Sequence, residues 1–123
     1  MEATERRLCF AGVLMFVLAL LLGFAIGVMP RPDAGRGVHV AGLEIGTFLI
    51  ATGLLWPKLS FTRWSNAVAT LLVASLYLLV VGLCWAAVEP PTTSVTAPLI
   101  VQIVASVAMV AATVATLFGF RSR

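Results

Sequence analysis

Charged residues are scarce in this sequence: only 11% of its 123 residues are Asp, Glu, Lys or Arg, whereas 61% are apolar. A water-soluble globular domain usually has about 25% charged and about 45–50% apolar residues. A chain with so few charges cannot cover a folded surface with polar groups, which excludes a water-soluble globule. We therefore expect the chain to lie in a lipid bilayer.

Cysteine and histidine are also rare. Two cysteines cannot form a disulfide framework, and a single histidine excludes a histidine-rich zinc site. The sequence contains no CxxC pair, no phosphate-binding glycine loop and no paired carboxylates, and its basic residues do not form the stripe typical of nucleic-acid binding. If the protein is an enzyme, a cofactor has to supply the electrophile.

Four long apolar stretches make up most of the chain. About 20 apolar residues in a helix cross a bilayer core roughly 30 Å thick. Each connection between the four stretches contains proline, which favours a helix end. The first stretch is longer than a signal-peptide core, so we keep it as a mature helix. We predict an all-α polytopic membrane protein, a single domain over residues 1–123 with four transmembrane helices at about 8–29, 38–56, 67–88 and 97–120.

The distribution of basic residues predicts the orientation. Two of them, Arg31 and Arg36, lie in the first connection, and none lies in the third. The other six lie at the N-terminus, in the second connection and at the C-terminus: Arg6, Arg7, Lys58, Arg63, Arg121 and Arg123. Because cytoplasmic loops carry the excess of Lys and Arg, we predict that both termini are cytoplasmic. This topology separates Cys9 from Cys84, so we expect no disulfide between them.

The single histidine, His39, is predicted to begin the second span. At 100° per residue, Gly42, Gly46 and Gly53 all lie within about 60° of it around the helix, so bare backbone follows the imidazole along one face. Two uses of this stripe are open. A neighbouring helix could approach closely, or a flat ligand could do so while His39 binds its metal.

Glu44 is the only carboxylate inside a predicted span, and Tyr77 is the only tyrosine. A carboxylate at mid-span costs a few kcal/mol, so such a residue usually faces the helix bundle and marks a functional path. Glu44 is turned about 140° from His39 and cannot share its helix face. Each residue has a structural alternative, a hydrogen-bonded acid for Glu44 and a buried hydroxyl for Tyr77. We keep both as candidate catalytic residues.

The run HVAGLEIGTFLIATGLLWPKL, residues 39–59, resembles the second span of the hydroxylaminobenzene mutase family, whose relatives include the styrene oxide isomerases. The shared features are the opening histidine, the three glycines, a Phe-Leu pair and the exit Gly-Leu-x-Trp-Pro-x-Leu at 53–59. The entry to the third span, residues 64–72, is also similar. Many relatives carry Asn just before the second glycine, where this chain has Ile45.

The resemblance implies a compact four-helix enzyme of the bacterial inner (cytoplasmic) membrane, a homotrimer that binds heme b between subunits through His39, with Gly42 and Gly46 against the cofactor. The iron would act as a Lewis acid on a small lipophilic aromatic substrate. It would convert an aryl epoxide to an aldehyde, or an arylhydroxylamine to an aminophenol, with no net redox change.

Two functions of other classes remain open. One is a small four-span transporter that couples transport to protons through Glu44, although the small multidrug-resistance exporters that it resembles in size carry their acid in the first span. The other is a non-catalytic accessory protein of the membrane, in which His39 caps a helix and the glycines only pack.

Overall fold

The computed structural model describes residues 1–59, 63–92 and 94–121, so Arg123 of the basic count lies outside the described residues. The described chain contains four α-helices and no strand: α1 (Ala3–Ala25), α2 (Pro32–Leu55), α3 (Ser65–Val88) and α4 (Thr96–Arg121). Two short 3-10 helices, η1 (Ile26–Val28) and η2 (Trp56–Lys58), follow α1 and α2. Each of the four spans is long and apolar enough to cross a membrane, as predicted.

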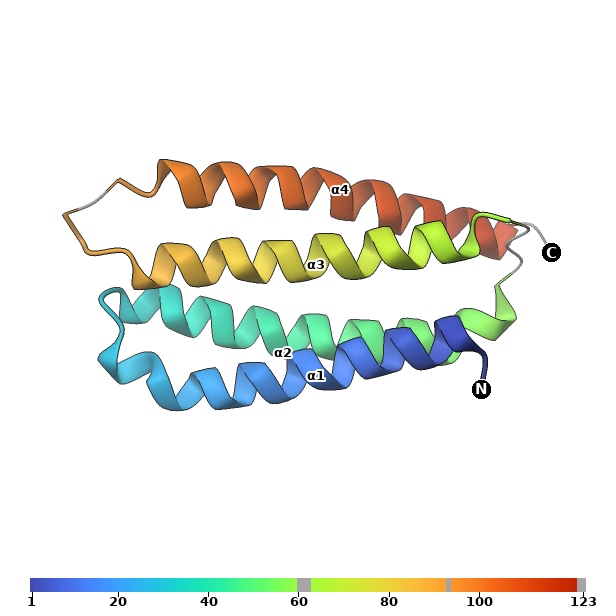
Figure 1. The fold of residues 1–123 in the computed structure, drawn as a ribbon, viewed down its shortest axis with the longest axis horizontal. Coiled ribbons are helices and arrows are strands. Elements are labelled where there is room, and N and C mark those ends of the chain that lie inside the picture. Colours follow the sequence, from blue (N-terminus) through green and yellow to red (C-terminus); the bar gives the residue numbers. More distant parts are fainter. Residues whose placement is uncertain (60–62, 93, 122–123) are drawn as a thin grey trace.

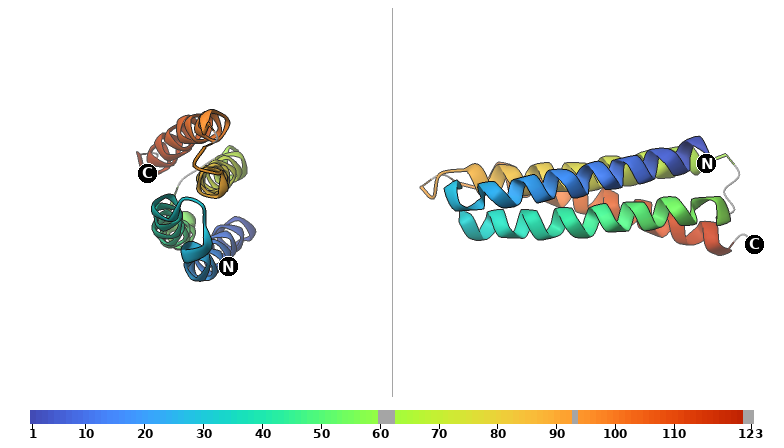
Figure 2. Two further views of the ribbon diagram at one scale, coloured as in Figure 1. Left: turned by 90° about the vertical axis from the view of Figure 1, so that its left-hand side faces the viewer. Right: turned by 90° about the horizontal axis from the view of Figure 1, so that it is seen from below.

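The helices form two antiparallel hairpins (Figure 1). α1 packs mainly on α2 and α4 packs mainly on α3, while contacts between α2 and α3 join the two hairpins. The view along the bundle shows the two pairs side by side (Figure 2). The start of α1 and the end of α4 lie at one end of the bundle, which we call the terminal end; the connection 29–31 and the end of α3 lie at the other, the loop end.

Two helices begin earlier than the apolar pattern predicts. α1 begins at Ala3 instead of residue 8, because Glu2 and Glu5 form a capping box at its start. α2 begins at Pro32 instead of residue 38, with proline in its first turn and Asp33 beside the positive end of the helix dipole. The apolar run marks the part of a helix that lies in lipid and leaves out its polar first turns. His39 therefore lies about two turns inside α2, and the idea that it caps a helix is wrong.

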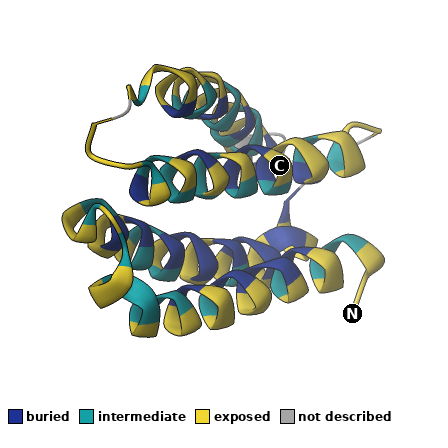
Figure 3. Ribbon diagram, turned by 60° about the vertical axis from the view of Figure 1, so that its left-hand side comes forward, coloured by how far each residue is buried: buried dark blue, intermediate teal, exposed yellow. Residues whose placement is uncertain are grey.

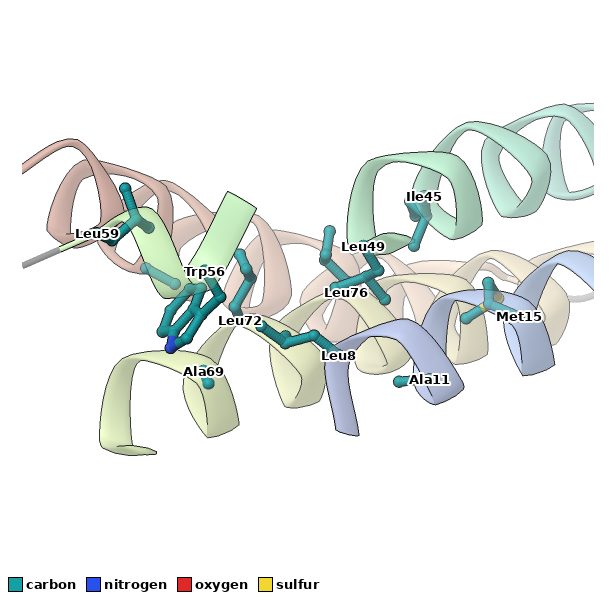
Figure 4. Packing of buried hydrophobic residues seen from close by; sticks show 11 residues of the cluster. Leu8, Ala11, Met15, Ile45, Leu49, Trp56, Leu59, Ala69, Leu72 and Leu76 are labelled. Atoms are coloured by element: carbon teal, nitrogen blue, oxygen red, sulfur yellow. The ribbon is translucent and has the colours of Figure 1, made fainter. Parts of the chain in front are cut away.

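The buried core is concentrated toward the terminal end, where three helices meet. Leu8 of α1, Leu49 of α2 and Leu72 of α3 are fully buried, and Trp56 is 2% exposed beside them (Figure 4). The Trp56 indole N–H donates to the Ser65 hydroxyl at 2.9 Å, which satisfies its only polar atom. Elsewhere buried residues line the sides where helices face each other, and large apolar side chains are exposed on the outer faces, as lipid contact requires (Figure 3).

Arg31 joins the two hairpins at the loop end. Its backbone N–H donates to the Ala87 carbonyl at 3.3 Å, and its guanidinium donates to the carbonyls of Glu89 (3.2 Å) and Pro90 (3.1 Å). These acceptors lie at or just beyond the C-terminal end of α3, where helix carbonyls lack partners and where a cation is favourable. Arg31 thus connects the start of α2 to the end of α3.

Replacing Arg31 with alanine should loosen the loop end. Hydrogen bonds from a charged group contribute about 1.5–3 kcal/mol each when buried, and this partly exposed pair should contribute less, about 1–2 kcal/mol in all. We expect the apparent melting temperature in detergent, followed by tryptophan fluorescence, to fall by several degrees. The matched control is Arg36→Ala, which removes only an ion pair to Asp33 whose side chains are 70% and 98% exposed. Equal melting temperatures for the two variants would contradict the role of Arg31.

Candidate functional site

The His39 imidazole is fixed against α1. Its Nδ1 lies 2.6 Å from the carbonyl oxygen of Ala19, and the residue is half-buried. Because a carbonyl can only accept, Nδ1 carries the proton and donates. In the neutral tautomer this leaves Nε2 with a free lone pair. Nδ1 therefore orients the ring, and Nε2 can bind a metal.

Gly23 of α1 makes room for that ring. A Cβ atom added at Gly23 would lie 2.9 Å from Cε1 and 3.0 Å from Nδ1 of His39. The residue was missed because the first span looks uniformly aliphatic. A signal was present: Gly12, Ala19 and Gly23 are spaced by seven and four residues, which places small residues on one face of the helix.

The glycine stripe of α2 packs directly on α1. A Cβ at Gly42 would lie 2.7 Å from the Cβ of Ala19, and one at Gly46 would lie 2.8 Å from the Gly12 carbonyl oxygen and 2.9 Å from the Phe16 backbone nitrogen. The sequence left open whether the glycine stripe packs on a helix or contacts a flat ligand. Within the protomer it packs closely on a helix. Gly46 has no open face toward a ligand there, whereas Gly42 also borders a cavity.

This cavity lies between α1, α2 and α3 and has a volume of about 340 Å³. Its walls are apolar apart from Tyr77 and Cys84, and Ala19, Gly42 and Val81 are among its lining residues. Its size falls at the lower end of the range for small-molecule pockets, which run from about 300 to 1,000 Å³. A single-ring aromatic compound entering from the bilayer matches both its size and its apolar walls.

Tyr77 is anchored to α1 as well. Its hydroxyl donates to the Ala11 carbonyl at 2.6 Å. This bond satisfies the hydroxyl, as a purely structural role of Tyr77 would require. The oxygen keeps lone pairs and can still accept a hydrogen bond from a ligand. Because Ala11 and Ala19 are eight residues apart on α1, the anchors of Tyr77 and His39 lie about 12 Å apart along the helix.

Glu44 lies away from this cavity. It is exposed, and it borders a groove between α2, α3 and α4 together with Phe48, Met109 and Thr113. The expectation that Glu44 faces the interior of the bundle is wrong, because α4 packs on α3 and leaves this side of α2 open. Tyr77 therefore lines the cavity, His39 contacts the carbonyl of Ala19 in its wall, and Glu44 borders a different groove.

No group of three or more His, Cys, Asp or Glu side chains that could bind a metal ion occurs in the part of the chain that the structure describes. Cys9 and Cys84 are both free, as predicted. His39 can thus offer a single protein ligand, which suits a metal that arrives with other ligands already in place, as the iron of a heme does.

Two curated proteins of Ectopseudomonas oleovorans are similar to this chain. Hydroxylaminobenzene mutase HabB is 46% identical over 55 residues, which cover 45% of this chain and 34% of the relative. Hydroxylaminobenzene mutase HabA is 35% identical over 68 residues, 54% of this chain and 50% of the relative. Over about half of its length the chain is similar to the hydroxylaminobenzene mutases.

The relationship covers part of each protein, since the chain spans between a third and a half of the length of these two mutases. No protein-family model and no solved structure matches the chain. The similarity to the mutases agrees with the family resemblance of the segment that begins at His39.

Proposed function

We propose that the protein is a heme-dependent membrane isomerase or mutase that rearranges a small apolar aromatic substrate. One observation carries the proposal: in a chain similar to the mutases, the sole imidazole is fixed through Nδ1 to the carbonyl of Ala19, a residue that also lines an apolar cavity of about 340 Å³. The substrate would be an arylhydroxylamine, giving an aminophenol, or an aryl epoxide, giving an aldehyde. Such lipophilic molecules partition into the bilayer, onto which the cavity would open.

The donor set at His39 fits a heme iron. Histidines that bind a metal almost always donate their second ring N–H to a carbonyl, carboxylate or water, and the bond from Nδ1 to Ala19 is of this kind. His39 would therefore hold heme b through Nε2. Of the glycines expected to contact the heme, Gly42 is the one that borders the cavity. Bound heme iron would supply a Lewis acid for the oxygen of the substrate.

The residues that line the cavity would bind and orient the substrate. The apolar walls exclude water and accept the aromatic ring, while the Tyr77 oxygen accepts a hydrogen bond from a donor such as the N–H or O–H of an arylhydroxylamine. An aryl epoxide has no such donor. Tyr77 is thus the residue that distinguishes the two substrate classes, and it favours the hydroxylamine.

We also propose, from the family resemblance, that the protein forms a homotrimer in the bacterial inner membrane. The positions of its Lys and Arg residues support cytoplasmic termini, and the similar mutases come from a bacterium.

The test is to express the protein in cells supplied with a heme precursor, purify it in detergent, and record its absorption spectrum and its turnover of phenylhydroxylamine and styrene oxide without added reductant. We expect a Soret band and a product from at least one substrate, with phenylhydroxylamine the better one. Protein from unsupplemented cells is the control. A Soret band without product would contradict the isomerase, and product from heme-free protein would contradict the cofactor.

A further inference from the structure

A second hollow surface lies between α2 and α4, apart from the cavity that α1, α2 and α3 enclose. It consists of two adjoining hollows of about 260 and 230 Å³, which share Phe48 and Thr113. We call it the α2–α4 groove. Apart from Glu44 and three threonines its lining is apolar. It follows the terminal half of α2 and the facing terminal half of α4.

Glu44 places a carboxyl group in this groove, halfway along a helix long enough to cross a membrane. It is the thirteenth of the 24 residues of α2, with about 16–18 Å of helix on either side. Among the described residues it has no hydrogen-bond or ion-pair partner. The nearest basic residue of its own helix, Arg36, is eight residues away, about 12 Å along the axis, and pairs with Asp33.

The groove offers hydrogen-bond acceptors, from Glu44 and from two of its three threonines. The Thr113 and Thr116 hydroxyls already donate to the carbonyls of Met109 (2.8 Å) and Ala112 (2.9 Å), so only their lone pairs remain for a ligand. The Glu44 carboxyl adds two further oxygens. Because a carboxylate in lipid costs a few kcal/mol, a ligand that brings several N–H donors to this depth would offset the cost.

We propose that the α2–α4 groove binds a lipophilic amine. The ammonium group would donate to Glu44 and lie within reach of the Phe48 ring, which attracts a cation to its face. The apolar tail would extend along the groove past Thr113 toward Leu117. This inference concerns a site separate from His39 and does not rest on the proposed isomerase function.

The test compares 4-phenylbutylamine with 4-phenylbutanol, which has the same apolar tail and a neutral head group. Binding to the full chain in detergent is measured by equilibrium dialysis against empty micelles. We expect saturable binding of one amine per chain, at least tenfold tighter than that of the alcohol. Glu44→Gln should weaken amine binding at least tenfold. It should leave the fold intact, because Glu44 is exposed and has no described partner.

The matched control is Asp33→Asn, which removes one carboxylate from the same helix outside the groove and should leave the amine affinity unchanged. Three outcomes would overturn the proposal. These are equal amine binding by Glu44→Gln and the unchanged protein, equal affinity for amine and alcohol, and uptake that does not saturate. A change of oligomeric state in Glu44→Gln, without saturable amine binding by the unchanged protein, would assign the groove to a second copy of the chain instead.

Discussion

Replacing Gly46 with leucine should separate α1 from α2 and leave little folded protein. Even the first atom of the new side chain would lie 2.8 Å from the Gly12 carbonyl oxygen and 2.9 Å from the Phe16 backbone nitrogen. Overpacking a core costs about 1–3 kcal/mol when side chains can adjust, and here the obstacle is the backbone of another helix. We expect the largest fall in apparent melting temperature of any single substitution in the stripe, measured in detergent by tryptophan fluorescence and by recovery of monodisperse protein.

Gly37→Leu is the control for this prediction. Gly37 belongs to the same helix, and a Cβ added there meets nothing within 4 Å. Leucine also favours a helix over glycine by roughly 0.5–1 kcal/mol, so this variant should be as stable as the unchanged protein or slightly more stable. If Gly46→Leu melted at the same temperature as Gly37→Leu, the close contact between α1 and α2 would be wrong.

Removing the imidazole should abolish the heme binding that we propose. In protein expressed with a heme precursor, His39→Ala should show no Soret band and no turnover, because the part of the chain that the structure describes contains no second histidine to replace it. Added imidazole should restore the band by filling the vacated position. A Soret band of normal intensity in His39→Ala without imidazole would show that another group binds the iron.

Gly23 tests the same site through the position of the ring. The nearest atoms to an added Cβ belong to the imidazole, the movable end of a side chain, so Gly23→Ala should shift the ring by a few tenths of an ångström and reduce heme content modestly. Gly23→Val should displace Nδ1 from the Ala19 carbonyl and remove most of the Soret band although His39 is still present. Gly27→Val, where nothing lies within 4 Å, is the control. Full heme content in Gly23→Val would contradict the fixed ring.

Much of the fold could be predicted from the sequence because the bilayer sets the length of an apolar helix. The four spans are present, and their ends differ from the prediction mainly at Ala3 and Pro32, where polar first turns continue a helix beyond the apolar run. Hydropathy measures which residues lie in lipid, whereas capping and backbone geometry decide where a helix begins. The start of the helix and the start of its apolar run therefore differ by one or two turns.

The candidate site was only partly predictable. The helical periodicity of the sequence correctly places His39 and the glycines on one face of α2. It does not show which residues cover that face. The covering atoms belong to α1, among them those of Gly12, Phe16 and Ala19, and the small residues of that helix are hidden among many leucines. Glu44 shows the same limit. Its rotation away from His39 follows from helix geometry, but the open groove beside it depends on how α4 packs.

The glycine contact between α1 and α2 also bears on how the protein is made. Both helices of this contact lie within the first 55 residues, and the contact forms without α3 or α4. Membrane helices insert first and associate afterwards, so the leading hairpin has its own docking surface while the ribosome is still synthesising the rest. We expect the imidazole to reach its carbonyl at that early stage, before the second hairpin arrives to enclose the cavity.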